Sequence, residues 1–323
     1  MAQGARPRIT RRALHGVLLL DKPLGWSSND ALQKAKWLLR AEKAGHTGTL
    51  DPLATGLLPL CFGAATKFSQ ISLDADKCYR ATLRLGQRTT TGDREGTVTE
   101  ERPVAIDAAM LQAAVARFTG AIAQLPPMHS ALKKDGKALY AYARAGEVVE
   151  RAARQVCIHA IDIVGWQDAE LVIDVRCSKG TYIRTLAEDI GEALGCGAHL
   201  SALRRTASGP LTLAGAVTLA DLETMGEAGR LALLQPVDTL LADWPQVALA
   251  PDEAGRFLTG LRRRLLLPDQ PALRVYGPQP GAFLGSAHIT AGELIPDRLL
   301  SPAEVQSLLS PQPHPAPEPL EAA

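Results

Sequence analysis

The feature that most constrains the fold is the twelve-residue segment GHTGTLDPLATG, residues 45–56. It holds three glycines, one proline, one histidine and one aspartate in a chain otherwise rich in Ala and Leu. Glycine and proline both disfavour a helix interior, and Pro52 biases Asp51 toward an extended backbone. We therefore expect a rigid loop that presents the Asp51 carboxylate outward, with Gly48 and Gly56 allowing tight turns or close approach of a ligand.

The composition of this loop leaves its role open. An Asp-Pro pair is a common turn former, and an isolated histidine such as His46 is more often a surface or core residue than a catalytic one. A carboxylate on a loop held by a rigid scaffold can equally serve a ligand. Asp51 is thus a candidate functional residue that needs support from other motifs.

Composition places the chain among ordinary globular proteins. Its 323 residues are 46% hydrophobic and 21% charged, and this length favours one large and one small unit. The five cysteines form no C-x-x-C pair, which indicates reduced core thiols in a cytosolic protein and no zinc site. They are Cys61, Cys78, Cys157, Cys177 and Cys196.

The N-terminal region is basic. Residues 1–43 contain nine Lys or Arg and three Asp or Glu, a net charge of +6. The apolar run 17–20 is too short for a signal peptide or a membrane span, so we expect a cytoplasmic protein that nothing exports or anchors. The charge fits either a docking site for a polyanion or a solvated basic arm.

Apolar periodicity predicts an order that mixes strands with helices. The expected strands are 16–21, 77–86, 156–166, 170–177 and 199–206, and the expected helices are 28–39, 107–118, 138–146 and 182–194. Ser28 or Asn29 is expected to cap the first helix, and the turn signal GDREG predicts a hairpin after strand 77–86. This mixture favours an α+β fold with a mixed, largely antiparallel sheet over a Rossmann fold.

A change in pattern near residues 236–250 marks a candidate domain boundary. Beyond it, a helix over 252–261 and short strands at 273–276 and 282–289 predict a small β-rich module. The last thirteen residues alternate proline with small or acidic residues, which predicts a disordered tail.

Two further stretches carry candidate chemistry. In LLLDKPLGWSSND, Lys22 precedes a helix N-terminus, where the free N–H groups favour an anion. The stretch lacks P-loop spacing, so a nucleic-acid phosphate fits better than a nucleotide. The alternative is an ordinary turn with a capping serine. In CSKGTYIRTLAEDIG, Arg184 falls in the first turn of a helix, where a cation is unfavourable unless an anion faces it. An aspartate carboxylate is the natural partner, and a bridge to Glu188 is the alternative.

Six segments together resemble the bacterial TruB family, the tRNA pseudouridine-55 synthases. They occur in the family's order: GVLLLDKPLGWSS, GHTGTLDPLATGLLPLCFGAATK, KCYRATLRLGQRTTTGDREG, PPMHSALKKDGKALYAYARAG, KGTYIRTLAEDIG and GAHLSALRRTASG. The resemblance covers roughly residues 14–240. The later segment VYGPQPGAFLGSAHITAGELIPDRLL is loosely similar to the family's small PUA-like RNA-binding domain.

The resemblance implies a division of the chain into four parts. These are a basic flexible arm (1–13), a catalytic domain with the pseudouridine synthase fold (14–240), a PUA-like domain (245–310) and a disordered tail (311–323). The catalytic domain would carry a thumb-like insertion at about 124–152.

The resemblance also implies an activity, the isomerisation of uridine 55 in the T-loop of tRNA. The base is flipped out, the N1–C1′ bond is broken, the uracil turns, and C5 bonds to C1′. No cofactor and no metal are needed, and the expected partner is the tRNA T-stem-loop. A membrane or an obligate protein partner is not expected, and the chain would be a monomer. The essential carboxylate would stabilise C1′, attack it, or remove the C2′ proton.

Residue roles follow from the matched positions. Asp51, Arg184 and Tyr79 match the catalytic set, in which the arginine pairs with the aspartate and the tyrosine stacks on the uracil. Tyr79, Tyr182, Leu203 and His46 match positions that contact the substrate. Lys22, Lys133, Lys134 and Lys137 are expected to contact the RNA backbone, although Lys22 and Pro23 also match a structural turn beside the site.

Two other functions compete with this interpretation. A protein that clamps and folds tRNA would not need the chemistry at all. A glycosidase would need a second carboxylate near Asp51, for which Asp93 in GDREG is the candidate.

Overall fold

The computed structural model describes residues 10–310 except 131, 148 and 266. The predicted disordered tail and most of the predicted basic arm therefore lie outside the described residues.

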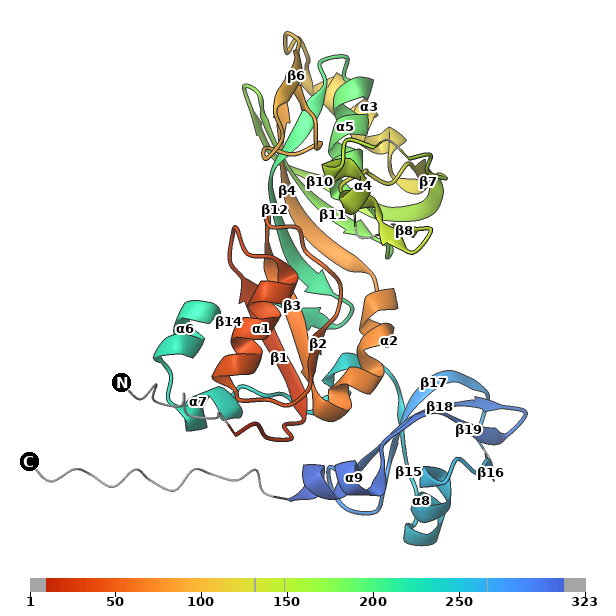
Figure 1. Cartoon of the computed structure of the whole chain (residues 1–323). Coiled ribbons are helices and arrows are strands. Elements are labelled where there is room, and N and C mark those ends of the chain that lie inside the picture. Colours follow the sequence, from red (N-terminus) through yellow and green to blue (C-terminus); the bar gives the residue numbers. More distant parts are fainter. Residues whose placement is uncertain (1–9, 131, 148, 266, 311–323) are drawn as a thin grey trace, which may run out of the picture.

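Ten of the described strands form one mixed sheet in the order β14-β1-β3-β12-β4-β11-β10-β7, with β2 paired to β3 and β13 to β12 (Figure 1). They are β1 (Gly16–Lys22), β2 (Ala44–His46), β3 (Ala54–Phe62), β4 (Lys77–Leu85), β7 (Gly120–Gln124), β10 (Arg154–Gln167), β11 (Glu170–Cys177), β12 (Ala198–Ser208), β13 (Leu211–Thr212) and β14 (Val217–Thr218). β1 pairs with β14 and β3 with β12 in parallel, and the other neighbours are antiparallel. The predicted α+β fold with a mixed sheet is confirmed.

Short strands and helices surround this sheet. Two small ribbons are formed by β5 (Gln87–Thr89) with β6 (Val98–Glu101) and by β8 (Lys133–Lys134) with β9 (Lys137–Ala138). The helices up to residue 241 are α1 (Ser28–Leu38), η1 (Gly63–Phe68), α2 (Ser69–Asp74), α3 (Ala108–Arg117), α4 (Leu139–Arg144), α5 (Ile183–Ala193), α6 (Leu219–Thr224), α7 (Glu227–Ala232) and η2 (Val237–Leu241). Among the described residues, no helix is both long and apolar enough to pass through a bilayer.

The long strands β4 and β12 run through both halves of the sheet and connect two cores (Figure 1). In the lower half, α1 packs its buried face on β1 and β3. In the upper half, α5 packs on β4 and β11. Tyr79 on β4 and Leu203 on β12 contact both clusters. Both side chains therefore lie where the two cores meet.

The loop predicted over residues 45–56 is shorter than its composition suggests. Its last residues belong to β3, where Gly56 is the parallel partner of Arg205 on β12. Gly56 has φ of +96°, and a Cβ there would lie 2.3 Å from the Arg205 carbonyl oxygen. The glycine is needed for the close approach of two strands, so the predicted loop ends at residue 53.

Two local predictions are corrected in detail. Ser27, not Ser28 or Asn29, caps α1 through the Asp30 N–H. The turn at GDREG closes a hairpin between β5 and β6, while β4 itself pairs with β11 and β12. In the first case the contact is made by the residue before the expected one, and in the second the hairpin is formed by the strand that follows β4.

A second sheet follows after residue 245, in the order β15-β17-β18-β19-β16. It comprises β15 (Gln246–Ala248), β16 (Arg263–Arg264), β17 (Gln270–Tyr276), β18 (Phe283–Thr290) and β19 (Glu293–Leu299), with α8 (Pro251–Leu258) and α9 (Pro302–Leu309) beside it. This confirms a small β-rich C-terminal unit. The helix α9 was not expected, although Ser301 and Glu304 form a capping box at its start.

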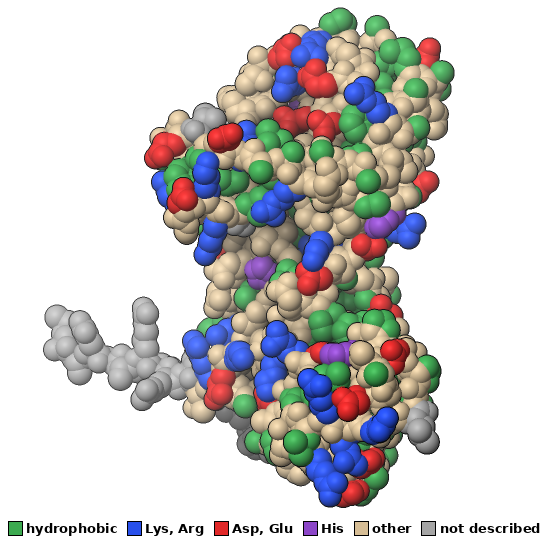
Figure 2. Space-filling model, turned by 90° about the vertical axis from the view of Figure 1, so that its right-hand side faces the viewer, with side chains coloured by type: hydrophobic (Ala, Val, Ile, Leu, Met, Phe, Trp, Pro, Cys, Tyr) green, Lys and Arg blue, Asp and Glu red, His purple; other side chains and the backbone are tan. Residues whose placement is uncertain are grey.

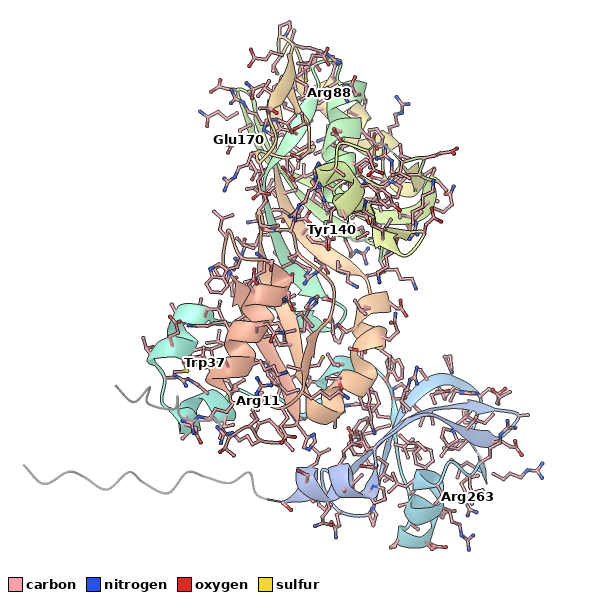
Figure 3. The ribbon with its side chains drawn as sticks, in the orientation of Figure 1. Arg11, Trp37, Arg88, Tyr140, Glu170 and Arg263 are labelled. Atoms are coloured by element: carbon pink, nitrogen blue, oxygen red, sulfur yellow. The ribbon has the colours of Figure 1, made fainter. Side chains whose placement is uncertain are left out.

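The C-terminal unit packs against the main one through apolar side chains. The rings of Phe68 on η1 and Phe283 on β18 lie 5.2 Å apart, and Lys67 pairs with Glu304 at 2.6 Å. On the face seen in Figure 2, Lys and Arg side chains gather below the middle of the molecule. Figure 3 places Tyr140 on the α4 insertion and Arg263 in the C-terminal unit.

Candidate active site

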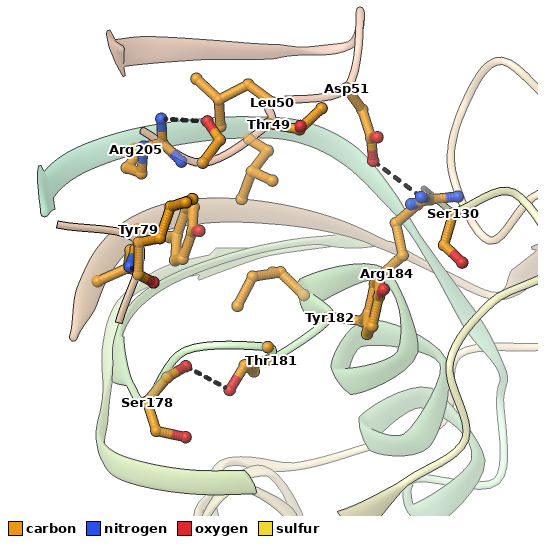
Figure 4. Close-up of a pocket in the computed structure, with 16 residues that line it drawn as sticks. Thr49, Leu50, Asp51, Tyr79, Ser130, Ser178, Thr181, Tyr182, Arg184 and Arg205 are labelled. Atoms are coloured by element: carbon orange, nitrogen blue, oxygen red, sulfur yellow. Dashed lines mark hydrogen bonds and ion pairs between the residues drawn. The ribbon is translucent and has the colours of Figure 1, made fainter. Parts of the chain in front are cut away.

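A cavity of about 270 Å³ opens between the two halves of the main sheet. Its lining comprises residues 48–51, 178 and 180–184 together with Leu73, Lys77, Tyr79, Ser130, Leu203 and Arg205. The loop that stood out in the sequence and the turn before α5 therefore face each other. In Figure 4 the pair of Asp51 and Arg184 lies on one side and Arg205 on the other.

The loop that carries Asp51 is anchored on both sides. Ser28 Oγ accepts a hydrogen bond from the Leu50 N–H (2.8 Å) and donates to the Leu50 carbonyl (3.0 Å). The Gly25 N–H donates to the Pro52 carbonyl at 2.8 Å. These bonds join the loop to the start of α1 and hold the Asp51 backbone in place.

Asp51 meets the guanidinium of Arg184 within the cavity. Arg184 Nη2 lies 2.9 Å from Asp51 Oδ2, and the side chains are 5% and 42% exposed. The cation is thus buried while the carboxylate still reaches the open space. Such an ion pair fixes the direction of the carboxylate toward whatever enters the cavity.

Arg184 also contacts two other segments, the turn at residues 91–93 and the segment around His129. Its Nε lies 3.7 Å from the buried carboxylate of Asp93, and it donates to the carbonyls of Thr91 (3.3 Å) and His129 (2.7 Å). The described ion pairs of Arg184 are with Asp51 and Asp93, whereas the alternative bridge to Glu188 is not among them. Asp93 does not line the cavity, which disfavours the two-carboxylate glycosidase.

Tyr182 is positioned by a side chain that sequence reasoning missed. Gln124, at the end of β7 and 1% exposed, accepts from the Tyr182 N–H (3.0 Å) and donates to the Tyr182 carbonyl (3.3 Å). Tyr182 caps α5 and has no side-chain cap of its own. The amide of Gln124 therefore fixes the entrance to the helix that carries Arg184.

Tyr79, Tyr182 and Leu203 form the less polar part of the wall. Burial raises the pKa of both tyrosines, so both phenols stay protonated at neutral pH. The structure brings these three predicted residues together with Asp51 and Arg184 around one cavity. An aromatic and aliphatic wall of this kind suits a planar base.

Arg205 forms the opposite side of the cavity and was also missed. It is 1% exposed and donates to the carbonyls of Leu57 (2.7 Å) and Gly48 (3.1 Å). Gly48 has φ of +86°, and a Cβ there would lie 3.2 Å from Arg205 Nη1. The signal was the pair Arg204-Arg205 on one strand, where alternation sends one arginine to each face.

The structure contradicts the predicted RNA-backbone contact of Lys22. This side chain is fully buried and donates to the carbonyls of Pro23 (3.0 Å) and Trp26 (2.6 Å). Burial lowers the pKa of Lys22 to about 8, an effect that the Asp51 charge opposes. Lys22 therefore stabilises the turn beside the site, as the alternative interpretation held.

The remaining predicted residues lie outside the cavity lining. His46 is half-buried on β2, and burial lowers its pKa. On the insertion, Lys133 and Lys137 are exposed, whereas Lys134 donates to the Glu150 carbonyl at 2.9 Å. In the described part of the chain, no group of three or more His, Cys, Asp or Glu side chains is placed to hold a metal ion.

Three family models match successive parts of the chain. They are the TruB family pseudouridylate synthase N-terminal domain (residues 36–183), the tRNA pseudouridylate synthase B C-terminal domain (184–242) and the pseudouridine synthase II TruB C-terminal domain (245–300). Together they cover most of the sequence.

Curated proteins and solved structures agree with these matches. The chain is 59% identical to tRNA pseudouridine synthase B of Verminephrobacter eiseniae over 97% of both chains, and 63% identical to that of Cupriavidus metallidurans over 91% of this chain and 96% of the other. A chain of a Cbf5-Nop10-Gar1 complex shares the fold with a TM-score of 0.69 at 24% identity, covering 90% of this chain and 87% of that one. The chain belongs to the TruB family of pseudouridylate synthases, which are isomerases.

Proposed function

We propose that this chain converts uridine 55 in the T-loop of tRNA to pseudouridine, with Asp51 as the essential carboxylate. The observation that carries the proposal is the partly exposed Asp51 carboxylate, 2.9 Å from a buried guanidinium and facing an aromatic cavity. The relatives named above are tRNA pseudouridine synthases, which supports tRNA as the substrate.

The target base has to leave the RNA stack before it can reach this cavity. Extrusion costs a few kcal/mol, which contacts between the flipped base and the cavity wall must offset. Tyr79 would stack on the uracil, with Tyr182 and Leu203 beside it. His46 would fill space near the displaced base.

Asp51 would act at the ribose once the base is in place. Breaking the N1–C1′ bond leaves C1′ electron-deficient. A carboxylate positioned by Arg184 can stabilise that centre, bond to it, or remove the C2′ proton. The freed uracil would turn against the aromatic wall until C5 faces C1′, and C5 would bond to C1′. C5 would then lose its proton and N1 would take one up, so that the product is an isomer of the substrate.

Other parts of the chain would hold the RNA. The catalytic domain would span residues 14–240, with a thumb-like insertion at about 124–152, and a PUA-like RNA-binding domain would span 245–310. Exposed Lys133 and Lys137 would contact phosphates, together with Lys134 if it leaves the Glu150 carbonyl. Each phosphate contact makes binding more sensitive to salt.

The test is incubation of the purified full chain and of Asp51→Asn with a T-stem-loop RNA, followed by nucleoside analysis. The parent should form pseudouridine at position 55, and Asp51→Asn should form none, because the amide has the same shape without the charge. Asp21→Asn is a matched control, since Asp21 also pairs with an arginine, Arg204, outside the cavity. Pseudouridine formed by Asp51→Asn at the parental rate would refute the proposal.

A further inference from the structure

Three side chains outside the cavity form a second arrangement of chemical interest. Cys157 Sγ lies 3.7 Å from His159 Nδ1, and His159 Nε2 lies 3.0 Å from Asp76 Oδ2. Cys157 and His159 come from β10, and Asp76 comes from the turn between α2 and β4. The thiol, the imidazole and the carboxylate therefore lie in a row, with the imidazole in the middle.

A β-bulge aims the histidine. Along the β10–β11 pairing, Ile158 faces Cys177 and Ala160 faces Arg176, so His159 is an extra residue with no partner across the strand pair. Bulges of this kind turn a side chain away from its regular direction. Here the imidazole is directed between the thiol and the Asp76 carboxylate.

This order of groups is the one that activates a nucleophile. When the Asp76 carboxylate accepts a hydrogen bond from Nε2–H, Nδ1 is left free to accept the thiol proton. The resulting imidazolium would be stabilised by Asp76 and would in turn stabilise the thiolate. The thiolate is the reactive form of cysteine.

The surroundings distinguish Cys157 from the other cysteines. Cys61, Cys177 and Cys196 are buried, and burial raises the pKa of the Cys61 and Cys177 thiols to about 12. Cys78 is half-buried like Cys157, and burial raises its pKa. Of the two accessible thiols, Cys157 is the one that contacts a histidine in the described structure.

Cys157 also lies directly behind the wall of the cavity. Its N–H donates to Ser178 Oγ at 2.9 Å, and its carbonyl accepts from the Ser178 N–H at 2.8 Å. Ser178 lines the cavity. The backbone of Cys157, though not its thiol, is therefore joined to a residue of the cavity wall.

We propose that Cys157 is an activated thiol that reacts with small electrophiles and hydroperoxides, with His159 as its base and Asp76 as the positioning residue. With hydrogen peroxide, the thiolate sulfur attacks one peroxide oxygen, so an S–O bond forms and the O–O bond breaks. The departing hydroxide takes the proton from the imidazolium and leaves as water. The sulfur is oxidised to a sulfenic acid, and the peroxide is reduced.

The test measures the rate of modification at each cysteine in the folded full chain. Iodoacetamide in one series, and hydrogen peroxide with a sulfenic-acid trap in another, are followed by peptide mass spectrometry at pH 7. Cys157 should react at least about tenfold faster than Cys78, because a base lies beside the Cys157 thiol. Equal rates at the two cysteines would overturn the proposal.

Variants separate activation from simple exposure. His159→Asn should lower the rate at Cys157 by about tenfold, and Asp76→Asn should lower it by a smaller factor. Both side chains are on the surface. The Asp76 charge also acts on the Cys78 thiol, so thermal unfolding, rather than the rate at Cys78, checks that the fold of each variant is intact. A Cys157 rate that does not change in His159→Asn would show that the histidine does not act as the base, which contradicts the proposal.

Discussion

Arg184 and Arg205 face each other across one cavity, and both are buried, yet their partners differ in kind. Arg184 meets the carboxylates of Asp51 and Asp93. Arg205 donates to the carbonyls of Leu57 and Gly48, and burial lowers its pKa. The comparison shows that the partners of a buried cation indicate its role. Arg184 holds the Asp51 carboxylate, and Arg205 shapes the loop that carries Asp51.

The sharpest test of this comparison is Arg184→Met. Pseudouridine formation should fall by about 10²- to 10³-fold, the loss that follows removal of one preorganised electrostatic partner. The free energy of unfolding should also fall by about 3–5 kcal/mol, because Asp93 is left buried without its cation. The double variant Arg184→Met/Asp93→Asn should recover stability but not activity in urea unfolding and nucleoside assays. Recovery of both would assign Arg184 a purely structural role.

Arg205→Met addresses the other half of the comparison. Two buried carbonyls lose their donors, which should lower the free energy of unfolding by about 2–5 kcal/mol. Urea unfolding at 25 °C measures this loss. Since no carboxylate in the described part of the chain forms an ion pair with Arg205, the folded fraction should keep most of its activity. A stable variant without activity would place Arg205 in the chemistry and break the comparison.

Lys22→Met tests a third buried cation that has carbonyl partners. The pKa of Lys22 is about 8 in the folded chain, below its ordinary value, so between these two values the unfolded chain binds more protons. The contribution of Lys22 to the free energy of unfolding therefore rises with pH. The difference between parent and variant should shift by about 1–2 kcal/mol in favour of the parent from pH 7 to pH 9.5. A constant difference over this range would contradict the burial of a charged lysine.

The smallest expected effect comes from a matched pair of glycines. Gly25 and Gly48 both have positive φ, +81° and +86°, so alanine should strain either turn by about 1 kcal/mol. A Cβ on Gly48 would also approach Arg205, whereas nothing lies within 4 Å of one on Gly25. Thermal unfolding should therefore show the larger loss for Gly48→Ala. Equal losses would mean that Arg205 tolerates the added methyl group.

Local patterns in the sequence predicted most of the regular structure. Alternation found β4, β11 and β12, and helical spacing found α1, α3 and α5. The misplaced cation at the start of α5 even pointed to a carboxylate partner. These features depend on neighbours a few residues apart, which is the range that periodicity reports.

Contacts between distant residues could not be predicted in the same way. Gln124 and Tyr182 are 58 residues apart, and Arg205 and Leu57 are 148 apart. Lys22 looked like a phosphate ligand because a lysine before a helix is normally exposed, and only the packing of the loop shows its burial. Gly56 looked like a loop residue in the sequence. A glycine is needed there because the Arg205 carbonyl on another strand lies too close for a Cβ.

The apolar contact of Phe68 with Phe283 holds the C-terminal unit at a fixed distance from the main sheet. The buried cluster runs without a break from Val17 and Cys61 into Val275 and Leu294. Sliding or tilting the C-terminal unit would open voids in this cluster, and close-packed interiors resist that. The C-terminal unit is therefore held in place against the main unit. The distance from the cavity to the surface of the C-terminal unit is therefore preset, and under the function proposed above an RNA bound to both would have to match it.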